Sequence, residues 1–305
     1  MCAVTNCDPE TDNAWPSGAS TTRTVRTARL GVSHAVPNRP VVIGGGAADR
    51  RGSRVSRRPD TAFAQLRGVD VLVTGFPAEA FGTNCYVVAT APGEECVVID
   101  PGIGVERQLD QLLAKHRLQP AAVLLTHGHL DHTFSVAPVC RARGITAYVH
   151  PGDLEMLADP AKGLSADLTE LFGGRLTYTE PDDVAELADG QVISIAGLEI
   201  TVNHAPGHTG GSVMFHAPDG PVRGDDTAPL CFSGDVLFAG SIGRTDLPGG
   251  DMAAMWASLR DKVLPLPDET VVLPGHGPTT TIAAERATNP YLREAASAAA
   301  PSKGW

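Results

Sequence analysis

The sequence contains no uninterrupted apolar run that approaches the length of about 18 residues needed by a membrane-spanning helix. This absence argues against an integral membrane protein. The 305 residues are enough for one large domain or two small ones, with a full hydrophobic core.

The sequence also lacks any Cys-x-x-Cys pair. Its six cysteines are widely scattered: Cys2, Cys7, Cys85, Cys96, Cys140 and Cys231. In a chain of this length an even cysteine count is weak support for disulfides, so we interpret the last four as small buried hydrophobic residues. No signal-peptide pattern is visible either, and we therefore expect a location in the reducing cytoplasm.

Positive charge is scarce outside the N-terminal segment. The net charge is −11, but residues 1–68 hold ten Arg, no Lys and five acidic residues, a balance of +5, so the remainder carries −16. An acidic body argues against broad binding to nucleic acid or to a membrane surface. We expect neither as a partner, and the sequence leaves the oligomeric state open.

Residues 1–68 show no sustained helical or strand periodicity, and their main apolar cluster, residues 41–43, runs directly into three glycines. No strand, Lys or helix surrounds these glycines in the pattern of a phosphate-binding loop. We therefore expect a disordered N-terminal extension rich in Arg, Thr and Gly. Two alternatives remain: a transit peptide, opposed by the acids near the start, or an extension without function.

From residue 69 onward, apolar periodicity and turn residues indicate an ordered body that ends near residue 292, followed by a flexible tail at 293–305. Strands are expected at 69–74, 83–89, 96–100, 122–126, 146–149, 192–195, 198–202, 212–216, 230–233 and 270–273. Helices are expected at 106–116, from about 133–135 to before 144, and from Asp251 to Val263. The Gly, Pro and Asp content of 218–229 favours an exposed insertion. Two sets of strands combined with helices predict an α/β fold with two sheets inside and helices outside.

The most informative stretch places three histidines and one aspartate within six residues, directly after an apolar run that is typical of a buried strand. These residues are His127, His129, Asp131 and His132. In extended backbone, residues two apart point the same way, which directs His127, His129 and in one interpretation Asp131 to one site, and His132 to another. Imidazole and carboxylate groups together suit zinc and similar divalent ions.

The second half of the body offers three more candidate ligands, each in a glycine-flanked turn after an apolar run: His208, Asp235 and His276. Glycine permits the sharp backbone bends that such turns need. Seven ligands are too many for one tetrahedral zinc, and they suit two metals that share a bridging carboxylate and a bridging water. Of the other histidines, His150 and His204 are candidates for supporting the ligands.

This pattern resembles the metallo-β-lactamase superfamily over roughly residues 69–292, and most of all its glyoxalase II-like, or hydroxyacylglutathione hydrolase-like, branch. Three further stretches carry the likeness: Ala205–Ser212, Gly243–Asp251 and Gly275–Leu292. The resemblance implies a four-layer αββα sandwich. It also implies that His127, His129 and His208 hold one metal, that Asp131, His132 and His276 hold the other, and that Asp235 bridges them.

The same resemblance implies a dinuclear metal-dependent hydrolase of thioesters formed by a low-molecular-weight thiol. The expected cofactors are two divalent ions, zinc first, with iron or manganese as alternatives. Asp131 is the expected catalytic residue, which orients or deprotonates the attacking water. Arg244 either lines the substrate entrance or pairs with Asp246. Family members specific for glutathione carry an additional helical domain after the last strand. Because the sequence ends at Trp305, we expect that domain to be absent or vestigial here, which fits the short form.

Three other functions stay open at this stage. Sulfur (persulfide) dioxygenases of the same superfamily share much of the ligand set but use one iron held by two His and one Asp. The loop at residues 247–250 favours the hydrolase branch instead. A β-lactamase is less favoured because Asp235 keeps a carboxylate that those enzymes generally lack. A metal-binding module without activity is less favoured still, because all seven ligands are present.

Overall fold

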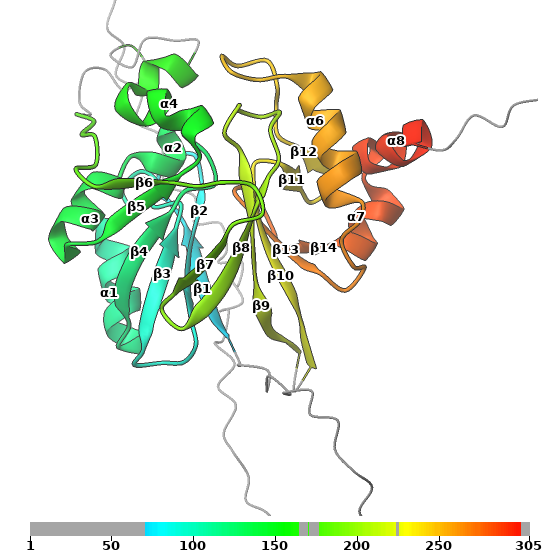
Figure 1. Ribbon diagram of the computed structural model, residues 1–305. Coiled ribbons are helices and arrows are strands. Elements are labelled where there is room, and N and C mark those ends of the chain that lie inside the picture. Colours follow the sequence, from blue (N-terminus) through cyan, green and yellow to red (C-terminus); the bar gives the residue numbers. More distant parts are fainter. Residues whose placement is uncertain (1–70, 165–169, 171–176, 224–225, 300–305) are drawn as a thin grey trace, which may run out of the picture. The chain divides into compact units, whose positions relative to one another are not determined.

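The computed structural model describes residues 71–164, 170, 177–223 and 226–299. The predicted N-terminal extension, residues 1–68, lies outside these ranges. Within them, the chain forms two six-stranded sheets with helices on their outer faces, and Figure 1 shows helices α1 and α3 on one sheet and helices α6 to α8 on the other.

The first sheet has the strand order β1-β2-β3-β4-β5-β6. Its strands are β1 Leu72–Pro77, β2 Asn84–Ala89, β3 Glu95–Ile99, β4 Gln119–Leu124, β5 Thr146–Val149 and β6 Val184–Glu186. The pairs β1/β2 and β2/β3 are antiparallel, whereas β3 to β6 run parallel to one another. The parallel strands have their carboxyl ends at one edge, which is where this half of the chain can place several polar side chains together.

The second sheet has the order β14-β13-β10-β9-β8-β7. Its strands are β7 Val192–Ile195, β8 Leu198–His204, β9 Val213–Arg223, β10 Asp226–Gly234, β13 Val271–Pro274 and β14 Thr280–Thr281. Strands β10 and β13 are parallel, and the other neighbours are antiparallel. A separate small hairpin consists of β11 Leu237–Phe238 and β12 Ser241–Ile242.

The helices and helical turns complete the described part of the chain. They are α1 Glu106–His116, α2 Leu130–Thr133, α3 Val136–Arg143, α4 Leu154–Ala158, α6 Met252–Ser258, α7 Ile282–Thr288 and α8 Pro290–Ala299, with 3₁₀ turns at Pro151–Asp153 and Pro160–Gly163 and a π-helical turn at Leu259–Val263. Of the helices among these residues, none combines the length and the apolar composition needed to cross a membrane.

Three apolar cores hold four layers together. The inner faces of the two sheets pack on each other, with Tyr86 and Ile99 from one sheet and Phe215 and Phe232 from the other in one cluster. Each sheet also has one outer core, which lies between that sheet and its helices. This is the four-layer αββα sandwich that the sequence predicted.

Helix α1 illustrates how local sequence sets these layers. Leu109 and Leu113, one turn apart, are buried against the first sheet. The helix starts with Glu106 and ends with Lys115 and His116, so its charges complement the helix dipole. Arg117 then takes a left-handed conformation with φ of 57° and ends the helix where the sequence predicted.

Several boundaries differ from the sequence-based expectation, and in two segments the kind of structure differs as well. The segment at 218–229, expected as an exposed insertion, is instead strand in both its described parts, because β9 and β10 extend as one long hairpin with irregular register near Asp226 and Ala228. Gly220 suits this hairpin because a Cβ there would lie 2.5 Å from Leu230 Cδ1. Helix α8 continues to Ala299 and buries Ala295, so helix covers the first seven residues of the expected flexible tail. The alanine content of this segment explains the extension, since alanine is the best helix former.

Candidate metal centre

All seven candidate ligands lie in the segments that follow strand ends, two of them in the short helix α2. Strand β4 ends at Leu124, three residues before His127, and β8 ends at His204, four residues before His208. Asp235 directly follows β10, and His276 is the second residue after β13. Backbone hydrogen bonds join the two sheets beside these turns, from Val213 N to Thr126 O at 2.8 Å and from Asn84 N to Gly275 O at 2.7 Å. Ligands from both halves of the chain therefore meet at one edge of the sandwich.

The side chains form three overlapping groups in which the potential ligand atoms all lie within 4.8 Å of one another. The groups are His127 with His129 and His208, His127 with His132 and Asp235, and Asp131 with His132 and His276. Every one of the seven residues belongs to at least one group. The structure thus brings together the complete predicted set.

Asp235 occupies the position between the first and third groups. Its Oδ1 lies 3.4 Å from His132 Nε2, while Oδ2 lies 3.5 Å from His208 Nε2 and 3.6 Å from His276 Nε2. One carboxylate therefore faces ring nitrogens from both groups. This placement is what a bridging carboxylate requires.

The extended alternation predicted from the sequence holds for His127 and His129 but not for Asp131. His129 has extended backbone, with φ of −64° and ψ of 144°, and helix α2 begins at the next residue. The change to helical geometry turns Asp131 toward His276, whose Nε2 lies 3.1 Å from Asp131 Oδ2. Asp131 accordingly belongs with His132 and His276, and the interpretation that grouped it with His127 and His129 is wrong.

Buried hydrogen bonds orient three of the imidazole rings. His132 Nδ1 donates to Asp100 Oδ2 at 2.9 Å, and His208 Nδ1 donates to the carbonyl of Arg244 at 2.7 Å. Thr126 Oγ1 donates to Asp100 Oδ2 at 2.6 Å, which leaves that hydroxyl to accept from His127 Nδ1 at 3.1 Å. In each ring the hydrogen bond at Nδ1 directs Nε2 toward the cluster, which leaves that nitrogen as the one available to a metal.

The pKa values divide the cluster into a neutral part and an ionised part. Burial, and then the neighbouring histidines, hold the pKa of His127 well below its ordinary value and lower the pKa of His129 to about 3. Burial alone would also lower the pKa of His132, but the carboxylates of Asp131, Asp235 and Asp100 outweigh it and raise the pKa to about 10. The first two rings are therefore neutral at physiological pH, whereas His132 carries a proton in the metal-free protein.

In Asp131 and His276 the pKa shifts in both cases favour the charged form. Burial would raise the pKa of Asp131, but the charge of His132 and hydrogen bonds from His276 and Thr83 hold it below its ordinary value. Burial would lower the pKa of His276, but the hydrogen bond to Asp131 and the charge of Asp235 raise it. The carboxylate is therefore available as an anionic ligand at neutral pH.

Unpartnered polar atoms show that the cluster suits a cation. Among the described residues, His127 Nε2, His129 Nε2 and Asp235 Oδ1 are buried without a hydrogen-bond partner. Leaving such groups buried and unpaired costs roughly 1–3 kcal/mol each, and a divalent ion would satisfy donor sets of imidazole and carboxylate. The residues present fit divalent metal binding.

Glycine permits the closest approach in the site. A Cβ on Gly275 would lie 2.7 Å from His132 Cε1 and closer still to Asp235 Oδ1. Gly234 has φ of +49°, and a Cβ there would lie 2.5 Å from Thr126 Oγ1. These two glycines let the turns after β10 and β13 pack directly against the ligands.

Three other residues that the sequence singled out, Arg244, His150 and His204, lie outside the three ligand groups. The Arg244 side chain is 60% exposed and pairs with Asp246 through two 2.7 Å hydrogen bonds, so the structure contains the predicted ion pair, while the Arg244 carbonyl orients His208. His150 and His204 stack with ring centroids 3.9 Å apart, and His204 Nε2 bonds the Gly210 carbonyl. None of the hydrogen bonds described for these two histidines reaches a candidate ligand.

Sequence reasoning missed three supporting residues. Asp100 holds His132 and Thr126, Thr83 donates to Asp131 Oδ2 at 2.8 Å, and the buried Asp153 contacts two of the ligand loops. Asp100 could have been found, because it is a polar residue directly after β3, as the ligands are after their strands. Its φ of 50° is a further sign of a constrained role.

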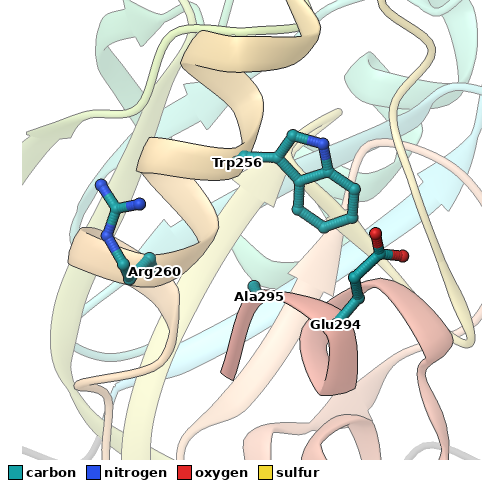
Figure 2. Close-up of a pocket in the computed structure, with 4 residues that line it drawn as sticks. All are labelled: Trp256, Arg260, Glu294 and Ala295. Atoms are coloured by element: carbon teal, nitrogen blue, oxygen red, sulfur yellow. The ribbon is translucent and has the colours of Figure 1, made fainter. Parts of the chain in front are cut away.

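A pocket elsewhere on the fold is separate from the seven ligands. Figure 2 shows its lining residues: Trp256 from α6, Arg260 from the adjoining π-helical turn, and Glu294 and Ala295 from α8. None of the seven candidate ligands lines it. The chemistry therefore points to the strand-end cluster and not to this pocket.

A comparison with known protein families agrees with the interpretation of the seven candidate ligands as a metal centre. The family model of the metallo-beta-lactamase superfamily matches residues 78–276, which include all seven candidate ligands. The chain belongs to the metallo-beta-lactamase superfamily.

Members of this superfamily similar to the chain carry different names. An uncharacterized protein of Mycobacterium tuberculosis is 48% identical over 73% of this chain and 98% of its own length. The hydroxyacylglutathione hydrolase GloC of Haemophilus influenzae is 32% identical over 71% of this chain and 95% of its own. The superfamily and the His/Asp groups together support a metal-dependent hydrolase.

Solved structures of the superfamily share both sequence and fold. The B3 metallo-beta-lactamase BLEG-1 is 37% identical, covers 72% of this chain and 99% of its own, and superposes with a TM-score of 0.62. TTHA1623 in a di-iron-bound form is 38% identical with the same coverage and a TM-score of 0.57. The likeness supports the fold and divalent metal binding.

Proposed function

We propose that the chain is a dinuclear metal-dependent hydrolase that cleaves thioesters of a low-molecular-weight thiol, as glyoxalase II-like enzymes do. The observation that carries the proposal is the placement of Asp235, whose carboxylate faces His208 from one proposed ligand group and both His132 and His276 from the other. The name of the relative from Haemophilus influenzae supports a hydroxyacyl thioester as the substrate class.

The proposed ligand division follows the geometry of the groups. One ion would be held by His127, His129 and His208, the other by Asp131, His132 and His276, with Asp235 shared. Zinc is the first candidate. Iron, which also suits imidazole ligands, and manganese, which suits carboxylates, are the alternatives. When bound, two such ions supply a water of lowered pKa and polarise the substrate carbonyl.

The protein's own groups would then orient the reactants. Asp131 is partly exposed, and its Oδ2 is held by Thr83. Because the pKa of Asp131 is lowered, its carboxylate is a weak base, which suits orientation of the attacking water better than deprotonation. His276 is 29% exposed, whereas His127 and His129 are buried, so we propose that substrate enters from the side of Asp131 and His276.

The chemistry of a thioester matches this residue set. A thiolate leaving group has a conjugate-acid pKa of about 8.5, so it departs at neutral pH without a strong general acid. The proposed role of Arg244 is contact with the substrate at the entrance, since its side chain is exposed beside the loop that orients His208. This role is separate from the ion pair with Asp246.

One observation favours a second candidate function. The group of His127, His132 and Asp235 consists of two imidazoles and one carboxylate, the donor set of mononuclear non-haem iron oxygenases. A persulfide dioxygenase would use such a set with one iron.

The deciding experiment combines metal analysis of the purified protein with two activity assays. One assay follows hydrolysis of a hydroxyacyl thioester of glutathione, together with the same acyl group on other small thiols. The other follows persulfide-dependent oxygen consumption. Two ions per chain with thioester turnover would support the proposal, whereas one iron per chain with oxygen consumption would replace it with the dioxygenase.

A further inference from the structure

Asp153 is a fully buried carboxylate that lies between the loops carrying three of the candidate ligands. It ends the 3₁₀ turn at Pro151–Asp153 and has no exposed surface. It is not one of the seven ligands. Among the ion pairs of the described residues, none involves Asp153.

Three hydrogen bonds link this carboxylate to both ligand loops. Oδ2 accepts from Gly128 N at 2.8 Å and from Thr209 Oγ1 at 2.6 Å, and Oδ1 accepts from Gly211 N at 2.7 Å. Gly128 lies between His127 and His129, while Thr209 follows His208. One side chain thus ties the loop after β4 of the first sheet to the loop after β8 of the second.

The surrounding backbone leaves little freedom for this link. A Cβ on Gly128 would lie 2.9 Å from Asp153 Cβ, and a Cβ on Gly211 would lie 2.6 Å from Asp153 Cγ. Gly152 is similarly close to the backbone of Gly210, with a Cβ distance of 2.8 Å to its oxygen. The two loops therefore meet directly on the Asp153 side chain, without an intervening layer.

The other group of ligands is held by different residues. His132 is fixed by Asp100, and Asp131 by Thr83. None of the hydrogen bonds described for Asp153 reaches Asp131, His132 or His276. Loss of Asp153 would consequently disturb the two groups unequally.

We propose that Asp153 is a positioning residue for the His127, His129 and His208 group, and that it sets the affinity of this group for a divalent ion selectively. The inference rests on the proposed metal centre. The carboxylate fixes the spacing between the two loops, and that spacing decides whether the three ring nitrogens meet around one ion. Partners that orient metal ligands are typically worth about 10–100-fold in affinity.

The test titrates metal-free protein with zinc against a chromophoric chelator, and measures bound ions by mass spectrometry under native conditions. Asp153→Asn keeps the size of the side chain but turns an NH₂ group toward at least one of the three donors. We expect one ion to bind at least tenfold more weakly in this variant, while the other keeps its affinity. When cobalt replaces zinc in this variant, the spectrum should show one occupied site, whereas the wild-type protein should show two.

Glu285→Gln is the matched control. Glu285 is also buried and also accepts three hydrogen bonds, from Gly240 N, Thr280 Oγ1 and Asn289 Nδ2. This variant should lose stability in thermal unfolding while binding both ions. Thr209→Val removes one of the three bonds to Asp153 without removing the carboxylate, and should weaken the same ion to a smaller extent, even if Asp153→Asn does not fold.

The outcomes separate the inference from the proposed function. If wild-type protein binds two ions and both Asp153→Asn and Thr209→Val retain their affinities, the inference is overturned and the metal centre stands. The same conclusion follows if Asp153→Asn and Glu285→Gln weaken both ions equally, because general loosening then explains the loss. If wild-type protein binds no ions, the proposed function fails as well.

Discussion

Replacing Gly275 by alanine tests the geometry of the site with a single methyl group. The new Cβ would lie 2.7 Å from His132 Cε1 and nearer to Asp235 Oδ1, whereas ordinary contacts begin at 3.4 Å. The His132 ring would have to move by about 0.7 Å, and the Asp235 carboxylate further, to restore normal contact. The backbone cannot easily yield instead, since Gly275 N and O are hydrogen-bonded to Gly234 and Asn84 at 2.8 and 2.7 Å.

A displacement of this size has a large expected effect on function. A misplacement of about 1 Å can cost roughly 100-fold in rate, and overpacking costs typically about 1–3 kcal/mol of stability. We therefore expect Gly275→Ala to lower kcat/KM for thioester hydrolysis by about 100-fold, to weaken metal binding, and to lower the melting temperature. Steady-state kinetics, metal analysis and calorimetry would measure the three effects.

Gly210→Ala is the matched control. Its Cβ would approach no described atom more closely than 3.9 Å, from Gly152 O, and Gly210 does not have a left-handed φ. This variant should keep both ions and wild-type turnover. If Gly275→Ala also keeps both, the contact between this turn and the ligands is not as close as the structure places it, and the reasoning is refuted.

Three further predictions concern the ions themselves. Asp235→Ala should reduce the bound ions from two to one and abolish thioester turnover; an active variant in a hydrolysis assay would contradict the dinuclear proposal. Removal of metal with a chelator should lower the melting temperature, because the buried Nε2 of His127 loses its partner, and added zinc should restore it in calorimetry. Because the pKa of His132 is raised from 6.5 to about 10 in the metal-free protein, an ion must displace its proton, so affinity should rise by about tenfold per pH unit as pH increases through this range. Isothermal titration in buffers of different ionisation enthalpy would detect the released proton, and a pH-independent affinity for both ions would count against the assignment.

The raised pKa of His132 also affects the stability of the metal-free protein. The folded-state pKa of His132 lies above its ordinary value, so its protonation stabilises the fold fully below pH 6.5. That stabilisation is lost as pH rises toward 10. Metal binding and metal-free stability therefore respond to pH in opposite directions.

The layered architecture and the ligand set could be predicted because both follow from local sequence patterns. Helix α1 was placed at its observed bounds from its leucine spacing, and the ligands were visible as polar residues after apolar runs. Strand β4 was expected at 122–126 but spans Gln119–Leu124. Proline cannot donate within a central strand, and Pro120 is tolerated here because the register with β3 shifts at that point.

Asp153 could not have been predicted as a supporting residue. It follows a turn and precedes a short helix, and its partners Gly128 and Thr209 are 25 and 56 residues away. Neither periodicity nor motif spacing encodes such a contact, because it depends on how two sheets dock. The grouping of Asp131 failed for a related reason: the sequence does not show that extended backbone ends at His129 and helix begins at Leu130.

The distribution of ligands along the chain has a consequence for how the protein matures. The first candidate ligand is His127 and the last is His276, and each group that contains Asp235, His208 or His276 also needs a residue from 127–132. At synthesis rates of about 5–20 residues per second, this interval takes roughly 7–30 s to emerge from the ribosome. During that time the early histidines are made but have no complete coordination partner. In the proposed metal centre, capture of the ions would therefore be a late event that follows formation of the second sheet, so the order of translation itself would delay loading of the metal.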